Sequence, residues 1–139
     1  MQGSENAGTL IGRILMSLLF ILGGWGKLMA PAATQAMLAS HNLPMVEVAW
    51  VLAVVVELGG GLAILFGLLT RPVACVCALW CVATALIAHT NFADRNMEIH
   101  FFKNLGLAGG FLYIAVFGAG AWSLDAVWRS RGSGAVAAE

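Results

Sequence analysis

The sequence predicts an all-α protein, a four-helix bundle that spans a membrane. Of its 139 residues, 60% are hydrophobic and only 10% are charged, and the mean hydropathy is +0.89. A soluble domain carries about 25% charged residues, so this chain has too few charges to cover a water-facing surface. Four apolar segments are each long enough to cross a bilayer as a helix, which takes about 20 residues. No stretch alternates in hydrophobicity as a barrel strand must.

The first expected span covers residues 9–29 and follows a short N-terminal tail, residues 1–8. No basic stretch precedes its apolar run, because Glu5 is the only charged residue before Arg13. No small-residue cleavage site follows it, so we expect the segment to be retained and not removed as a signal peptide. The next loop, residues 30–42, contains Pro31 and can form a short interfacial helix.

The second and third spans are expected at residues 43–69 and 72–90. The link between them is so short that it predicts an antiparallel hairpin. Arg71 lies in this link and is expected at the interface, where its long side chain can reach the headgroups. Pro72 suits the first turn of the third helix.

The fourth span is expected at residues 100–121. The loop before it contains Asp94, Arg95 and Glu98, which belong in water or among headgroups. After the bundle, residues 126–139 are small and polar and are expected to form a mobile tail. The transmembrane domain is therefore expected to cover residues 9–125, with no separate soluble domain.

The distribution of basic residues predicts that both termini are cytoplasmic. In a four-span protein the termini share one side, which here carries four basic residues: Arg13, Arg71, Arg129 and Arg131. The other side carries three: Lys27, Arg95 and Lys103. Loops rich in Lys and Arg stay in the cytoplasm. Lys27 and Lys103 lie at span ends, so they count for less as loop residues.

One carboxylate, Glu57, lies inside the apolar second span. It is ten residues beyond Glu47, which places it about 15 Å deeper in the bilayer. A charge at that depth normally faces the bundle interior or a water-filled cavity. The topology brings four other polar residues to the same half of the bilayer: Lys27, His89, Lys103 and Asn104. We predict that Glu57 is a proton-exchanging catalytic residue and that these four form a polar binding cluster.

Small residues predict where the helices approach one another. Gly59, Ala63 and Gly67 recur at four-residue spacing in the second span, and Gly106 and Gly110 do so in the fourth. Such spacing lets helix backbones touch. The sequence leaves open whether a neighbouring helix or a ligand fills the space beside Glu57.

The sequence indicates no metal or haem site. The three cysteines of the third span lack a C-x-x-C spacing and are expected to pack as small apolar residues: Cys75, Cys77 and Cys81. A haem held by two histidines needs both at equal depth on facing spans, and only His89 lies clearly in a span. Trp80, in mid-span, is also expected to pack. The net charge of zero gives no indication of nucleic-acid binding.

Five motifs in this order and spacing resemble the DoxX family, and within it the YqjF-like branch. They are GRILMSLLFILGGWGKL (12–28), VELGGGLAILFGLLTR (56–71), LIAHTNFAD (86–94), FFKNLGLAGGFL (101–112) and SLD (123–125). The resemblance covers residues 12–125 and implies a four-helix fold in the bacterial inner membrane. It also carries over the polar set residue by residue: Lys27, Glu57, Arg71, His89, Lys103 and Asn104.

The resemblance implies a quinone-linked redox role, because the family takes its name from membrane subunits of a thiosulfate:quinone oxidoreductase. The chain has no cofactor motif of its own, so redox chemistry would require a bound quinone or a partner subunit. Three hypotheses remain open: a redox subunit or accessory component of a membrane oxidoreductase, a scaffold that recruits soluble enzymes, and a small carrier that would have to form a homo-oligomer. A shared fold does not decide among them.

Overall fold

The computed structural model describes residues 2–136 of the chain, and every regular element in that range is a helix. The first span is α1 (Gln2–Met29). The second is one continuous helix made of α3 (Val46–Val54), η1 (Val55–Gly59) and α4 (Gly60–Phe66). The third is α5 (Thr70–Ala88) and the fourth is α6 (Arg95–Phe117). They form four segments long and apolar enough to cross a membrane. The predicted all-α architecture with four membrane-spanning helices is therefore confirmed.

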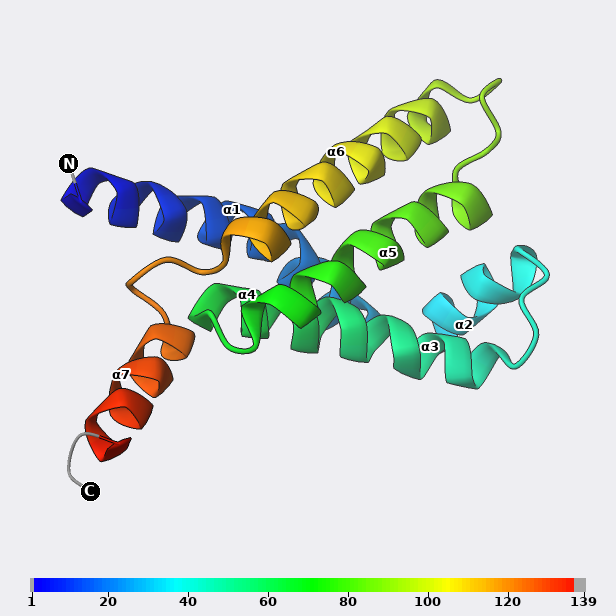
Figure 1. Ribbon diagram of the computed structural model, residues 1–139. Helices are drawn as coiled ribbons and strands as arrows, with labels where there is room; N and C mark the ends of the chain where they lie inside the picture. The colour runs from blue at the N-terminus through cyan, green and yellow to red at the C-terminus, as the bar shows by residue number, and fades with distance from the viewer. Residues whose placement is uncertain (1, 137–139) are drawn as a thin grey trace.

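Two shorter helices lie outside the spans. The first, α2 (Pro31–Ser40), begins with proline at its first position and lies beside α3. It confirms the short helix expected in the first loop. The second, α7 (Leu124–Val136), follows the last span and points away from the bundle (Figure 1).

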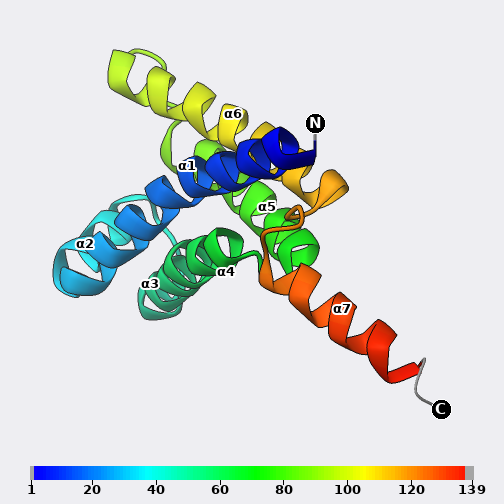
Figure 2. The same ribbon diagram turned by 90° about the vertical axis from the view of Figure 1, so that its left-hand side faces the viewer.

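The spans form two groups that cross near the middle of the molecule. Helix α1 packs along η1 and α4, whereas α5 and α6 form an antiparallel pair (Figures 1 and 2). At the crossing, the rings of Phe20 and Phe111 are 4.8 Å apart, and Ile64, Cys77 and Cys81 complete the buried core. We call the end with α2 and the α5–α6 loop the far end, and the opposite end the near end. Toward the far end the two groups spread apart (Figure 1).

Several helix boundaries differ from those expected. Helix α1 already begins at Gln2, because residues 2–8 contain no proline and Glu5 stabilises its first turn. Helix α6 begins at Arg95 instead of residue 100, because the Asp94 side chain accepts a hydrogen bond from the Asn96 backbone and caps it. It ends at Phe117 instead of residue 121. The expected C-terminal tail is helical to Val136, and residues 1 and 137–139 lie outside the described range.

The close approach of α1 to the second span depends on Gly24 and Gly61. A Cβ added at Gly24 would lie 2.4 Å from the backbone nitrogen of Leu58. One added at Gly61 would lie 2.9 Å from the Ile21 side chain. In contrast, a Cβ at Gly59 would meet nothing within 4 Å, so this member of the expected stripe is not at a contact.

A buried arginine joins the near ends of the spans. Arg13 of α1 is only 2% exposed. Its guanidinium donates hydrogen bonds to the carbonyl oxygens of Leu65, at 3.0 Å, and of Trp122. Leu65 lies in the last turn of α4 and Trp122 follows α6, so one side chain connects three spans. Arg13 was expected among the basic residues near the membrane surface, and its burial removes it from that count.

The carboxylate of Asp125 caps the N-terminus of α5. It accepts hydrogen bonds from the backbone nitrogens of Leu69, at 2.8 Å, and Thr70, at 2.9 Å. Burial acts to raise the pKa of Asp125, but the hydrogen bonds from Thr70 and Leu69 and the charge of Arg129 hold this pKa below its ordinary value. The turn between α4 and α5 also needs Gly67, whose φ is +68°.

Candidate functional site

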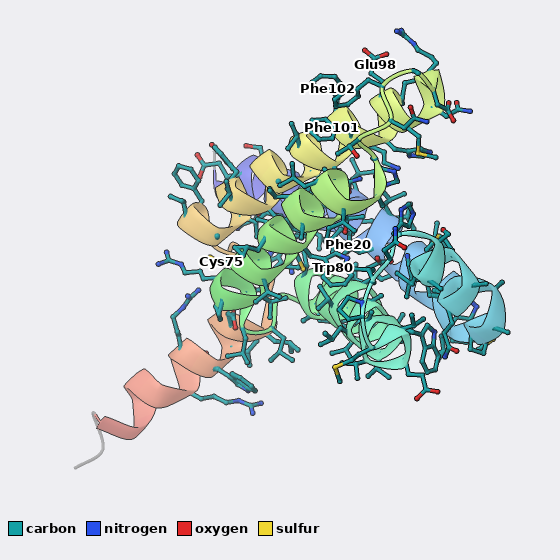
Figure 3. The ribbon with its side chains drawn as sticks, turned by 90° about the vertical axis from the view of Figure 1, so that its right-hand side faces the viewer. Phe20, Cys75, Trp80, Glu98, Phe101 and Phe102 are labelled. Carbon is teal, nitrogen blue, oxygen red and sulfur yellow. The ribbon has the colours of Figure 1, made fainter. Side chains whose placement is uncertain are left out.

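A polar cavity opens in the far half of the bundle, where the two helix groups spread apart. Its volume is about 400 Å³, and α1, η1, α5 and α6 all contribute to its wall. Figure 3 shows Phe20 and Trp80 between the α5–α6 pair and the other spans, in this part of the molecule. The cavity is lined by all five polar residues that the sequence analysis placed together: Lys27, Glu57, His89, Lys103 and Asn104.

Glu57 lies on the π-helical turn η1 in the middle of the second span. A π turn inserts one extra residue into a helix and is frequent at functional sites. The Glu57 side chain is nearly buried and points toward α1 at Gly23. A Cβ added at Gly23 would lie 2.8 Å from Glu57 Oε2, so only glycine leaves enough room for the carboxylate.

Two side chains bind the carboxylate of Glu57. The Lys27 Nζ atom donates to Oε2 at 2.5 Å, and the Trp80 Nε1 atom donates to Oε1 at 3.0 Å. The Lys27 and Glu57 side chains are 25% and 11% exposed, so the ion pair is largely removed from solvent. The indole of Trp50 donates to the Lys27 backbone carbonyl at 2.9 Å. Trp80, expected only to pack, is therefore a direct partner of the carboxylate.

Imidazole and ammonium groups surround the far end of the cavity. The rings of His89 and His100 stack with their centroids 5.2 Å apart, and Lys103 Nζ lies 2.8 Å from His100 Nδ1. Asn104 donates to the backbone carbonyl of His100 at 2.9 Å.

The charges around the cavity favour a ligand that accepts hydrogen bonds or carries negative charge. Among the described residues that line the cavity, Glu57 is the only acidic one, and Lys27 already compensates its charge. Lys103 adds a second positive charge. Leu19, Phe20 and Leu107 supply an apolar wall toward the middle of the membrane. The arrangement can therefore hold an apolar ring with oxygen atoms at its edge, next to a carboxylate that can exchange a proton.

The remaining candidate residues lie elsewhere. Arg71 is exposed in the first turn of α5 at the near end, where the hairpin between the second and third spans was expected to place it. Cys77 and Cys81 are buried in the core and Cys75 is exposed; none of them lines the cavity. Within the described part of the chain, no group of three or more His, Cys, Asp or Glu side chains is placed to hold a metal ion.

Comparison with known proteins places the chain among membrane proteins of a defined family. A family model described as DoxX matches residues 8–90. The chain is 44% identical to inner membrane protein YqjF of Escherichia coli over 131 residues, which cover 94% of this chain and 99% of the relative. It is 39% identical to inner membrane protein YphA of the same organism over 121 residues, 84% of this chain and 86% of the relative. No solved structure shows a significant match.

Proposed function

Since the chain belongs to the DoxX family, we propose that it is a bacterial inner-membrane protein that binds a quinone in its polar cavity and serves as a subunit or accessory component of a membrane oxidoreductase. The observation that carries this proposal is the Glu57 carboxylate, held by Lys27 and Trp80 on the wall of a cavity open to the membrane interior. A residue needed only for packing would have its surroundings filled by a neighbouring helix.

The cavity fits a quinone head group in size and in chemistry. Its volume of about 400 Å³ lies within the ~300–1,000 Å³ range of small-molecule sites. Phe20 and Leu107 present apolar surface to a ring, and ammonium donors lie on both sides of it: Lys27 beside Glu57, and Lys103 at the far end. A bound quinone would supply a two-electron acceptor whose carbonyl oxygens take up protons on reduction.

The residues of the chain would hold the ring and deliver protons. Lys103 is a donor available to the ring oxygens, whereas the single N–H group of Trp80 is already bonded to Glu57. Glu57 exchanges a proton, and Lys27 stabilises its charged form by their close contact. The electrons would come from a partner subunit or a soluble donor, because no redox motif was found in the sequence.

A complementation experiment tests this function. Wild type, Glu57→Gln and Glu57→Asp would each be expressed in a strain that lacks the protein, and the rate of quinone reduction would be measured in its native membranes. The control is Glu47→Gln, which alters an exposed carboxylate on the same span. The expected result is loss of quinone reduction with Glu57→Gln, because an amide cannot exchange a proton at neutral pH. Glu57→Asp is expected to retain part of the rate and Glu47→Gln all of it. Full activity of a normally folded Glu57→Gln protein would contradict the proposal.

A second candidate function is a membrane scaffold, and helix α7 favours it. This helix projects from the near end of the bundle, and its Trp128 is 56% exposed (Figure 1). It therefore offers a surface to a soluble protein. If Trp128→Ala abolished the biological function while Glu57→Gln did not, the scaffold would replace the quinone-linked role.

A further inference from the structure

A second hollow lies between α1 and α6, toward the near end. Its volume is about 530 Å³, and its wall includes the apolar side chains of Met16, Ile114 and Phe117. Gly12 and Gly110 leave the helix backbones bare on its two sides. A Cβ added at Gly12 would meet nothing within 4 Å, so the space beside this residue is open.

The apolar hollow and the polar cavity meet where α1 crosses α6. Met16 touches Gly110 at this point: a Cβ added to the glycine would lie 2.7 Å from the methionine Cε. Phe20 and Leu107, about one turn away on the two helices, belong to the polar cavity. The two cavities share no lining residue, but only the partly exposed contact of Met16 with Gly110 separates them, so they lie in line along one seam between α1 and α6, with a mostly apolar wall at the near end. From Lys103 to Phe117 this seam extends about 21 Å along α6.

The seam is open to the bilayer from the side. Helices α1 and α6 pack together only at their crossing, unlike the extensive α5–α6 contact. Leu19 and Leu22 line the polar cavity on α1 and are 43% and 60% exposed on the surface that faces lipid. A ligand can therefore pass from the membrane into the cavity without entering water.

We propose that the seam between α1 and α6 binds a long-tailed, membrane-resident amphiphile in one orientation. The ring lies in the polar cavity, and an isoprenoid or alkyl tail crosses Met16 and Gly110 and ends in the apolar hollow. This inference rests on the proposed function and adds lateral entry, a fixed orientation and a preference for a tailed ligand. A water-soluble ring without a tail is expected to bind more weakly.

The contribution of the tail to affinity is modest for a physical reason. Lipid chains already surround the tail in the bilayer, so burying it in protein brings no hydrophobic gain. Its benefit comes from packing against Met16, Ile114 and Phe117. We compare the dissociation constants of tailed and tailless quinone at equal concentration in the membrane. The tailed quinone is expected to bind about fivefold more tightly.

The test uses one benzoquinone ring with three tails: none, decyl, and a long isoprenoid. Binding to the full chain in lipid nanodiscs is followed by quenching of tryptophan fluorescence, and Trp80→Phe identifies the signal from the cavity. Gly12→Leu fills the apolar hollow. Gly26→Leu is the matched control, because Gly26 is also an open position on α1 but lines neither cavity. A long-tailed probe with a diazirine at the tail end maps where the tail lies.

The expected result is that Gly12→Leu removes the advantage of the long tail and leaves binding of the tailless ring unchanged, whereas Gly26→Leu changes neither. The probe should label residues 8–16 and 110–118, and excess unlabelled long-tailed quinone should prevent this. Equal affinity for all three tails, or labelling spread over lipid-facing residues without competition, would overturn the inference and leave the quinone site standing. Failure of every probe to bind would overturn the proposed function itself.

Discussion

The ion pair between Lys27 and Glu57 leads to an asymmetric prediction for protein stability. The test is a double-mutant cycle of Lys27→Met, Glu57→Gln and the combined variant. Methionine keeps the apolar stem of lysine, and glutamine keeps an oxygen acceptor for Trp80. The two single changes each remove one charge, but they leave different charges behind.

The structure sets the expected size of each effect. Lys27→Met strands the carboxylate of Glu57, which is 11% exposed in the middle of a span and is too short to extend to the interface. Loss of one partner from such a pair costs about 3–5 kcal/mol. Glu57→Gln strands Lys27, which is 25% exposed near the far end of α1 and can extend its ammonium toward the interface. We expect a cost of about 1–2 kcal/mol for this change.

The combined variant should be more stable than Lys27→Met alone. It contains no unpaired charge, so its stability is expected to lie within about 1 kcal/mol of wild type. The coupling energy between the two positions should then be at least about 3 kcal/mol. The assay is the free energy of unfolding in mixed micelles titrated with a denaturing detergent. Lys103→Met, which alters an exposed lysine, is the control. A Lys27→Met cost no larger than that of Lys103→Met, or additive effects in the cycle, would refute the reasoning.

Four further predictions concern the rest of the fold. Gly24→Ala should destabilise the protein by about 2 kcal/mol or more because its Cβ would collide with the Leu58 backbone, whereas Gly59→Ala should be neutral or stabilising in the same unfolding assay. Asp125→Asn should cost about 1 kcal/mol at pH 7. Because the pKa of Asp125 is lowered in the folded protein, this carboxylate stabilises the fold above about pH 4, and the stabilisation is lost as the pH falls through the folded-state pKa. Between pH 7 and pH 3, the free energy of unfolding should therefore fall less in Asp125→Asn than in wild type. Replacement of the three cysteines by alanine should leave folded yield and quinone binding nearly intact, and a loss of binding with normal folding would implicate the thiols: Cys75, Cys77 and Cys81. A reporter fused after Glu139 should be active in the cytoplasm, and activity confined to the periplasm would reverse the topology.

The polar cluster could be predicted from the sequence because charges are costly inside a bilayer. Glu57 was conspicuous in an apolar run, and the up-and-down order of four spans placed Lys27, His89 and Lys103 at the same depth. Depth follows from counting residues along a helix, so it needs no knowledge of packing. The structure brings all of these residues to one cavity.

The partners that depend on helix rotation could not be predicted in this way. The π turn at Glu57 adds a residue that a regular 3.6-residue period does not reveal, and it changes which neighbours the carboxylate meets. Trp80 is apolar enough to pass as core packing, so its indole donor was overlooked. The space beside Gly23 could have been predicted, because a glycine four residues before Lys27 lies on the same face of the helix as Lys27.

Arg13 was misplaced because it was counted among residues near the membrane surface. The rule that selected Glu57 applies equally to Arg13, which lies within the first apolar segment and needs partners there. Its partners are backbone carbonyls that become free where α4 ends and beyond the end of α6. Sequence patterns identify side chains, and a site built from backbone carbonyls leaves no such pattern.

The most direct test of the quinone site is the quinone content of the purified protein. Wild type, Glu57→Gln and Glu47→Gln would be purified from native membranes in the same mild detergent, and quinone and phospholipid extracted from each would be quantified. The account predicts that wild type and Glu47→Gln retain quinone well above its ratio to phospholipid in the membrane, in an amount approaching one per chain. It predicts that Glu57→Gln retains less, because the charge that orients Lys27 and Trp80 is gone. Quinone in wild type at no more than the membrane ratio would contradict the account.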